Sequence, residues 1–461
     1  MRQLSLLMSR RELAAVILAS ALVTLDGTAA TVALPAIGTE LAVSFSRLQW
    51  ISNAPLLALA ALLLPAGGLA DSYGRARLVR VGLLTFGAAS AACALAPSYP
   101  WLIAGRFVQG AGGALVLPAA LARLRAAYTA PEERTRKFGV WAAWTGVAAA
   151  AGPLLGGALI DLLSWRAVFV MSGGLAAGAL ILLGSAGDRD HVRQRRGIPV
   201  REATGLAVFL GATAYLLIEG GAAGWTSKRM LFVALLVPLS LTMVVQGSRR
   251  VALLPRELLA RRNCMAANGA TFALYLGMFG LPFLLVLYTQ QALKYSGTWA
   301  GAAVLPISVM LFLAEPFGRI AGRVGTRRLI LLGSLVAAAG ILWIAAGAHP
   351  LAFWTRLIAG AALFGLGVSM AVSALTHAAV AAVPEACAGA ASGLNHATAR
   401  ASGLLAIALL GTLAGGSDAT GISPEGFRRA MWVCGVLVGA GGLAGGLRIR
   451  DEEPGGLTSS G

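Results

Sequence analysis

The feature that most constrains this chain is the recurrence of apolar runs about as long as a lipid bilayer is thick. Of its 461 residues, 57% are hydrophobic and only 12% are charged, whereas a soluble domain has about 25% charged residues. A helix needs about 20 apolar residues to cross the hydrocarbon core. The sequence therefore predicts an all-α integral membrane protein. Fourteen spans are expected, at about 12–37, 48–69, 76–95, 100–124, 138–160, 165–184, 201–222, 229–246, 263–290, 298–320, 327–347, 351–376, 387–413 and 428–447.

The first apolar run follows a short basic segment, as the hydrophobic part of a signal peptide does. Arg10 and Arg11 form a twin-arginine pair just before it. The run is longer than the roughly 7–15 apolar residues of a signal peptide, and many similar runs follow. We therefore expect a first span that is retained.

Basic residues are distributed unevenly between the expected spans. If the N-terminus is cytoplasmic, the inner segments and their flanks hold 27 lysines and arginines, whereas the outer ones hold eight. The positive-inside rule then places both termini in the cytoplasm. This requires an even number of spans, which agrees with the count of apolar runs. The prediction is a multi-pass protein of the cell membrane.

The sequence also contains a weak internal repeat. Residues 55–78 match residues 306–329 at an offset of 251, and one span later the offset is 250. Chance recurrence is the alternative in a chain with 59 glycines, but the matches keep register over two helices and a loop, as a repeat does. Two six-helix units are the plan of one class of secondary transporter. The matched pairs are Pro55 and Pro306, Pro65 and Pro316, Gly67 and Gly318, Gly74 and Gly325, Arg77 and Arg328, Leu78 and Leu329, Pro100 and Pro350, Arg106 and Arg356, and Gly110 and Gly360.

The repeat divides the chain into four expected parts, two of which are the repeated bundles. They are an N-terminal six-helix bundle (1–186), a cytoplasmic linker with two extra membrane helices and the following loop (187–262), a C-terminal six-helix bundle (263–447) and a disordered cytoplasmic tail (448–461).

Several classes of function are disfavoured. The net charge of +18 comes from clusters between apolar runs and not from a basic surface interleaved with aromatic residues, so nucleic acid is not an expected partner. The four cysteines have no CxxC spacing and the four histidines form no HExxH motif, so we expect no metal, no cofactor and no enzyme. A GxxxxGK[ST] loop for nucleotide phosphates is missing from the sequence, which disfavours a nucleotide-driven pump. A membrane scaffold or receptor stays open as a different class.

One acidic residue, Asp26, lies inside the first apolar run. At about 1.5 Å of helical rise per residue it is roughly 21 Å beyond Glu12, within a hydrocarbon core about 30 Å thick. An ionised Asp at that depth costs about 2.5–3.5 kcal/mol, so it must be protonated or paired. Arg106 in the fourth run is the candidate partner. The alternatives are a structural hydrogen bond for Asp26 and an Arg106 side chain that extends to the outer interface.

A carboxylate at this depth suits proton coupling. It can hold a proton while a cavity faces an acidic exterior and lose the proton when the cavity faces the cytoplasm, provided that substrate binding competes with the proton. We therefore take Asp26 and Arg106 as the candidate proton-coupling residues.

Five short motifs together resemble the major facilitator superfamily, and in particular its fourteen-span drug:proton antiporters. The resemblance covers essentially the whole chain. Ala76, Thr31 and His396 depart from it, since the family usually has a basic residue, an asparagine and a second asparagine there. The motifs are LDGTAATVALP (25–35) in the first span, GGLADSYGRAR (67–77) before the third, RFVQGAGGA (106–114) in the fourth, GPLLGG (152–157) in the fifth and ASGLNHATARASG (391–403) in the thirteenth.

The resemblance implies a proton-coupled secondary transporter that exports a drug or an antibiotic-like metabolite by alternating access. The loop motif is then a conformational latch, with a plain tight turn as the alternative. The fifth-span motif marks exporters, with simple helix packing as the alternative. Its glycines, like Gly67, let helices approach closely, and Gly74 supplies a positive φ. The motif residues are Gly67, Asp71, Gly74, Arg75 and Arg77 in the latch, Arg106, Gln109 and Gly110 in the fourth span, and Gly152, Pro153, Gly156 and Gly157 in the antiporter motif.

The candidate cavity residues are Glu315, Asn395, His396 and Arg400. His396 and Arg400 are four residues apart and share a helix face, whereas loop solvation is the alternative for Glu315. Few acidic residues lie at depth, so arginines, His396 and aromatic side chains suit an amphipathic, neutral or weakly anionic small molecule. Proton-coupled import and the dedicated export of one metabolite remain open. The expected partners are this small molecule, protons and the lipid bilayer, with the chain acting as a monomer.

Overall fold

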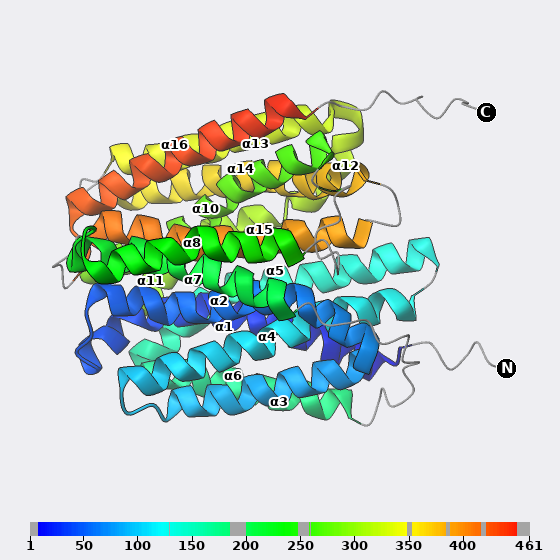
Figure 1. Cartoon of the computed structure of the whole chain (residues 1–461), viewed down its shortest axis with the longest axis horizontal. Coiled ribbons are helices and arrows are strands. Elements are labelled where there is room, and N and C mark those ends of the chain that lie inside the picture. The colour runs from blue at the N-terminus through cyan, green and yellow to red at the C-terminus, as the bar shows by residue number, and fades with distance from the viewer. Residues whose placement is uncertain are drawn as a thin grey trace.

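The computed structural model is a bundle of long helices that run roughly along one direction (Figure 1). It describes residues 8–128, 130–184, 200–247, 258, 260–347, 353–383, 388–415 and 421–449. Most of the expected linker and of the expected tail lies outside these residues. The described residues form no β-strand, as expected for an all-α protein.

The first six helices form one half of the molecule, which we call the N-half. It occupies the lower part of Figure 1 in blue to teal. Its helices are α1 (Arg10–Glu40), α2 (Phe45–Tyr73), α3 (Arg75–Ala94), α4 (Tyr99–Ala127), α5 (Pro131–Leu162) and α6 (Trp165–Leu183).

The last helices form the second half, the C-half, with an inserted pair between the two. The inserted helices are α7 (Val200–Ala223) and α8 (Lys228–Gly247). The C-half contains α10 (Arg262–Gln291), α11 (Gly297–Leu311), α12 (Ala314–Val324), α13 (Thr326–Ala346), α14 (Phe353–Ala381), α15 (Ala388–Gly415) and α16 (Pro424–Arg448).

The two halves repeat the same packing. Helix α3 packs on α4 as α13 packs on α14, and α1 contacts α5 and α6 as α10 contacts α15 and α16. The junctions match as well: Gly74, between α2 and α3, has φ 96° and ψ 132°, and Gly325, between α12 and α13, has φ 93° and ψ 133°. Only glycine adopts this backbone region at no steric cost. The internal repeat read from the sequence is therefore present in the fold.

Twelve helices within the described ranges are long and apolar enough to cross a membrane. The prediction of fourteen spans is thus not confirmed. The other two expected runs do form helices, α2 and α8, which are not among the twelve. Helix α2 carries the polar residues Arg47, Gln49 and Asn53 in its first turns, and α8 begins with the basic residues Lys228 and Arg229.

The expected span 298–320 is not one continuous helix. It breaks at Phe312 and Leu313, which separate α11 from α12. Pro316 lies three residues after Leu313, and because a proline has no amide proton it cannot donate to the carbonyl oxygen of Phe312, one turn earlier. The amides of Phe312 and Leu313 bond three residues back instead, at 3.3 and 3.0 Å.

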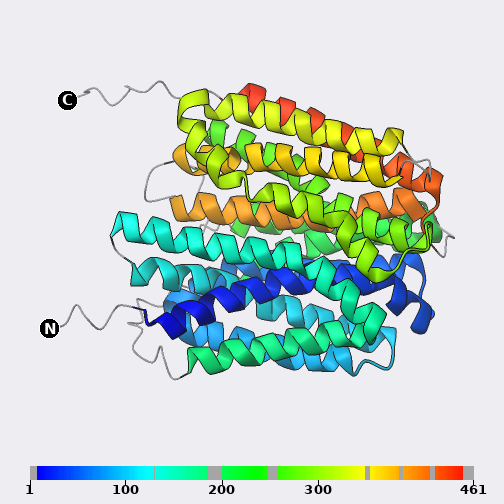
Figure 2. The same cartoon turned by 180° about the vertical axis from the view of Figure 1, so that it is seen from behind.

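Helix α1 begins and α16 ends at the same end of the bundle, as both views show (Figures 1 and 2). We call this the terminal end, marked by Arg10 and Arg448. The opposite end, marked by Glu40 and Pro424, is the distal end.

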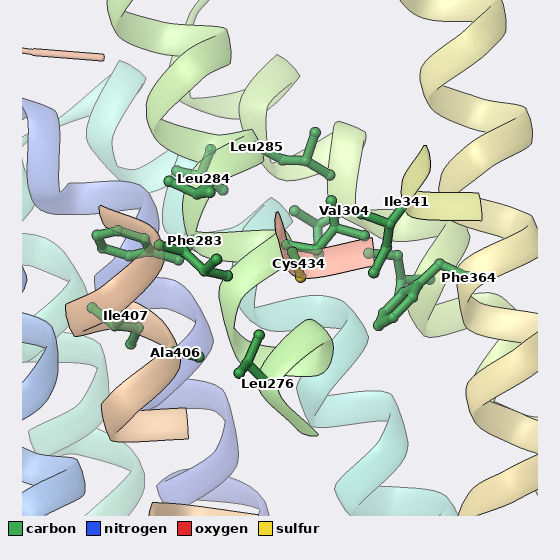
Figure 3. Packing of buried hydrophobic residues seen from close by; sticks show 14 of the residues in the cluster. Leu276, Phe283, Leu284, Leu285, Val304, Ile341, Phe364, Ala406, Ile407 and Cys434 are labelled. Carbon is green, nitrogen blue, oxygen red and sulfur yellow. The ribbon is translucent and has the colours of Figure 1, made fainter. Parts of the chain in front are cut away.

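The core of the C-half is apolar and closely packed (Figure 3). Phe364 of α14, Ile341 of α13 and Cys434 of α16 are fully buried there. A Cβ added to Gly277 of α10 would lie 2.9 Å from the ring of Phe364 and 3.2 Å from Ile341. This core therefore has no room for an additional side chain on that face of α10.

Candidate functional site

Asp26 and Arg106 form an ion pair inside the N-half. The Arg106 Nη1 atom lies 2.7 Å from Asp26 Oδ2, and the two residues are 2% and 3% exposed. The alternative in which Arg106 extends to the membrane interface is wrong. Two charges taken out of water need good geometry and further hydrogen bonds to be stable, and the neighbouring side chains supply them.

Gln109 connects both charges. Its Oε1 accepts a hydrogen bond from Arg106 Nη1 at 2.7 Å, and its Nε2 donates to Asp26 Oδ1 at 3.2 Å. Ser90 of α3 accepts a bond from the same Nε2 at 2.8 Å and donates to the carbonyl oxygen of Phe86. These bonds fix the orientation of the amide, so Gln109 holds the Arg106 and Asp26 side chains in position next to each other.

Ser172 of α6 supplies the other donor to the carboxylate. Its hydroxyl lies 2.8 Å from Asp26 Oδ1 and 3.1 Å from the carbonyl oxygen of Val168. The guanidinium of Arg106 also lies 5.6 Å from the ring centroid of Phe169 and donates from Nε to the carbonyl oxygen of Ile51 at 3.4 Å. The carboxylate thus accepts three hydrogen bonds, from Arg106 on Oδ2 and from Gln109 and Ser172 on Oδ1.

The sequence did not predict that Ser90 and Ser172 belong to the site. Each is a single hydroxyl residue in an apolar helix, and such a residue usually bonds back to its own helix. Both make that bond as well. No spacing or motif distinguished them from the other buried serines.

The latch motif lies at the junction of α2 and α3. Gly74 has the expected positive φ, Arg75 is partly buried and Arg77 is exposed, while the side chain of Asp71 lies outside the described part. The close helix approach expected at Gly67 is wrong for this conformation, because an added Cβ would meet no atom within 4 Å. The Cβ position of Gly67 therefore faces open space.

The antiporter motif is a packing face on both sides of α5. A Cβ on Gly152 or Gly156 would collide with Thr28 or with Ala29 of α1. On the other side, a Cβ on Gly157 would collide with the carbonyl oxygen of Gly297 in α11. A Cβ on Gly301 of α11 would likewise collide with the Pro153 carbonyl oxygen. In the fourth-span motif, a Cβ on Gly110 of α4 would collide with the Pro55 carbonyl oxygen of α2. Backbone contact at these positions is the close packing that small residues permit in membranes.

The four candidate cavity residues do not form one site. Asn395 is buried and donates to Thr271 Oγ1 at 2.9 Å, so it joins α15 to α10. The Glu315 side chain is 80% exposed, and the Arg319 Nε atom lies 4.0 Å from its Oε1 atom. In this conformation Asn395 therefore links two helices, whereas the Glu315 side chain lies at the surface.

His396 and Arg400 are one helical turn apart and share a helix face. They lie in the middle of α15, where His396 is exposed and Arg400 is partly buried. Arg400 lies over the ring of Phe279 at 5.8 Å, and the ring of Tyr275 is 6.4 Å from that of Phe279. A cation, a histidine and two aromatic rings are thus grouped in the C-half, away from the ion pair.

Polar side chains join the two halves at the distal end. Gln49 of α2 donates to the carbonyl oxygens of Ile407 and Ala408 in α15, at 2.8 and 3.0 Å. Gln290 of α10 donates to the Val32 carbonyl oxygen of α1 at 3.0 Å. The halves are therefore fastened together at the distal end.

The inserted helix α7 lies against both halves. Its Leu210 and Ile218 form a buried cluster with Leu57 of α2 and Leu404 of α15. Glu219 accepts a hydrogen bond from the Trp50 indole of α2 at 3.2 Å, and Thr412 of α15 donates to the Leu217 carbonyl oxygen at 2.8 Å. Helix α7 thus covers the seam between α2 and α15.

A repeated pair of helical bundles fastened at one end, with a buried ion pair in one of them, defines the class of this protein as a membrane transporter. The profile of the Major Facilitator Superfamily matches residues 16–407, and the chain belongs to this family.

The relatives and the structural neighbours agree with this assignment. The puromycin resistance protein of Streptomyces alboniger is 33% identical over 448 residues, covering 93% of this chain and 86% of that protein. A probable actinorhodin transporter of Streptomyces coelicolor is 33% identical, over 88% of this chain and 73% of that protein. The crystal structure of an auto-inhibited peptide transporter of the POT family has the same fold, with a TM-score of 0.70 and 17% identity over 96% of this chain and 98% of that one.

Proposed function

We propose that this transporter exports a small, amphipathic drug or antibiotic-like molecule in exchange for protons. The observation that carries the proposal is the buried pair of Asp26 and Arg106. A carboxylate at this depth in a membrane is costly, and such residues mark substrate, ion or proton pathways by default. The names of the relatives, which refer to antibiotic resistance and to the transport of actinorhodin, support export.

The membrane topology follows from the charge distribution. Both termini are cytoplasmic, so the terminal end faces the cytoplasm and the distal end faces the exterior. Helices α2 and α8 cross the membrane with the twelve other spans, because each joins two neighbouring spans that run in the same direction. The protein works as a monomer in the cell membrane.

The transport cycle alternates access by rocking the two halves. With the distal end fastened, the conformation described above is open to the cytoplasm, and cargo enters between the halves. When the distal end opens, protons from the acidic exterior reach the N-half. Protonation of Asp26 weakens the bonds that Arg106, Ser172 and Gln109 make to the carboxylate, and Arg106 retains the carbonyl oxygen of Ile51 and the ring of Phe169 as partners.

The return of the proton closes the cycle. When the distal end is fastened again, Ser172, Gln109 and Arg106 re-form their bonds to the carboxylate, which drives the proton off towards the cytoplasm. Coupling requires that cargo and proton exclude each other, because a carrier that accepts both at once would dissipate the gradient.

The cargo is neutral or weakly anionic and has an aromatic or other apolar part. Arg400 over Phe279, with His396 one turn away, provides a cation and flat apolar surfaces in the C-half. A cationic group next to an aromatic face favours a molecule with a negative or polar substituent on a planar body.

A susceptibility panel in an efflux-deficient bacterial host tests the proposal. Expression should raise the resistance to several structurally different amphipathic compounds, and a protonophore should abolish that resistance. Resistance to one compound would instead support a dedicated exporter, and accumulation of a compound inside the cells would support import. Growth unchanged for every compound, at normal protein levels in the membrane, would favour a scaffold or receptor.

A further inference from the structure

The start of α11 is bonded to a residue from the other half of the molecule. Asp161, in the last turn of α5, accepts hydrogen bonds from the Gly297 and Thr298 amides, both at 2.8 Å, and from the Thr298 hydroxyl at 2.7 Å. The residue that would ordinarily cap this helix is Ser296, and its side chain makes no capping bond. The first turn of α11 is therefore capped by the N-half.

This contact combines three favourable terms. The first amides of a helix have no partner within the helix, so Asp161 satisfies two of them. A carboxylate at a helix N-terminus also meets the positive end of the helix dipole, and hydrogen bonds to a charged group are stronger than neutral ones. Because α5 and α11 are in different halves, all three terms are lost if the distal ends separate.

The backbones of α5 and α11 are in direct contact next to Asp161. A Cβ added to Gly297 would lie 3.1 Å from the Gly157 carbonyl oxygen. One turn further along, a Cβ added to Gly301 would collide with the Pro153 carbonyl oxygen. The antiporter motif thus brings α5 and α11 into contact, and Asp161 lies at the end of that contact, one turn beyond Gly157.

We propose that Asp161 is a positioning residue of the transport cycle, which holds the distal end shut by capping α11 across the two halves. Its carboxylate stabilises the conformation open to the terminal end, and rocking to the opposite conformation breaks this cap. The inference depends on the rocking of the two halves, but not on the identity of the cargo or on proton coupling.

The distance between the two halves at the distal end tests this directly. Spin labels on Ser98→Cys, at the start of α4, and Glu425→Cys, at the start of α16, report the separation by double electron–electron resonance in detergent or nanodiscs. Both native residues are exposed. Cys387 is replaced by serine, whereas Cys93, Cys264 and Cys434 are buried. No cargo and no pH gradient are needed, so the result is independent of whether the export proposal holds.

Asp161→Ala should raise the ratio of distal-open to distal-closed molecules by about tenfold or more, as the loss of charged hydrogen bonds implies. Asp161→Asn keeps one acceptor oxygen and should give a smaller shift in the same direction. Glu40→Gln is the matched control: Glu40 is also a distal carboxylate, but its partners Arg166 and Trp165 belong to the same half, so the ratio should stay at the wild-type value.

Two outcomes would overturn the proposal. One is an unchanged distance distribution in both Asp161 variants, and the other is an equal shift in Glu40→Gln. If Asp161→Ala does not fold, Asp161→Asn and Thr298→Val, which removes only the hydroxyl donor, decide the question. Absence of a shift in both of these would also overturn it.

Discussion

The N-half and the C-half share one architecture but differ in what fills their cores. In the N-half, the space between α1, α3, α4 and α6 holds Asp26, Arg106, Gln109, Ser90 and Ser172 in one bonded network. In the C-half, the corresponding helices α10, α13, α14 and α16 bring Gly277, Ile341, Phe364 and Val438 together in apolar contact.

The repeat counterpart of Arg106 makes the difference clear. Arg356 occupies the matching position, but it is exposed, and its guanidinium lies 5.9 Å from the ring of Trp343. The six-helix architecture therefore does not need a buried charge. Among the described residues, the matching position of the C-half has no buried ion pair, which favours the proposed role of Asp26 and Arg106 in proton coupling.

The largest expected effect comes from removing the cation in each half. Arg106→Ala leaves Asp26 buried without its partner and should lower the free energy of unfolding by about 3–5 kcal/mol. Arg356→Ala removes an exposed contact with an aromatic ring and should cost less than about 1 kcal/mol. Chemical unfolding in detergent micelles measures both, and equal losses would refute the contrast between the halves.

A buried serine in each half gives the next comparison. Ser172→Ala removes a donor to the carboxylate and should cost about 1.5–3 kcal/mol. Ser334 of α13 is equally buried, but its hydroxyl has no hydrogen-bond partner among the residues that the structure describes, so Ser334→Ala should be neutral or slightly stabilising. Thermal unfolding followed by tryptophan fluorescence can rank the two variants, and a larger loss in Ser334→Ala would contradict the description of both sites.

A glycine in the first helix of each half gives the smallest effect. Gly277→Ala places a methyl group 2.9 Å from Phe364 and should cost about 1–3 kcal/mol through overpacking. Gly27, next to Asp26, has no atom within 4 Å of an added Cβ, and alanine there should stabilise the helix by about 0.5–1 kcal/mol. The same unfolding assay distinguishes them, and stabilisation by both substitutions would show that the C-half core is looser than described.

Much of the fold could be predicted from the sequence because the membrane imposes it. Long apolar runs must become helices in lipid, and the match of Gly74 with Gly325 reflects one backbone turn used twice. The number of spans was harder to predict, since Arg47, Gln49 and Asn53 make α2 more polar than a usual span. The break between α11 and α12 lies just before Pro316. The sequence shows the proline, but it does not show at which residue the helix is interrupted.

The site was predictable only in part, for a physical reason. A charge at depth must be paired, so Asp26 and Arg106 could be matched by their cost alone. The bonds of Ser90, Ser172 and Asp161 depend on the relative rotation of helices from distant parts of the sequence, and that rotation leaves no trace in composition or spacing. The bond between Asn395 and Thr271 could not be predicted for the same reason, because helix position alone does not specify which neighbour a side chain faces.

The most direct test of the account is transport against a gradient by the Asp26→Asn protein. Purified wild-type and variant chains are reconstituted in proteoliposomes, and uptake of a compound to which the susceptibility panel shows resistance is followed with and without an imposed pH gradient. The wild-type protein should accumulate the compound only with the pH gradient, whereas Asp26→Asn should equilibrate the compound without concentrating it. Full accumulation by Asp26→Asn, or by the wild-type protein with the protonmotive force collapsed, would contradict the role of Asp26 in coupling.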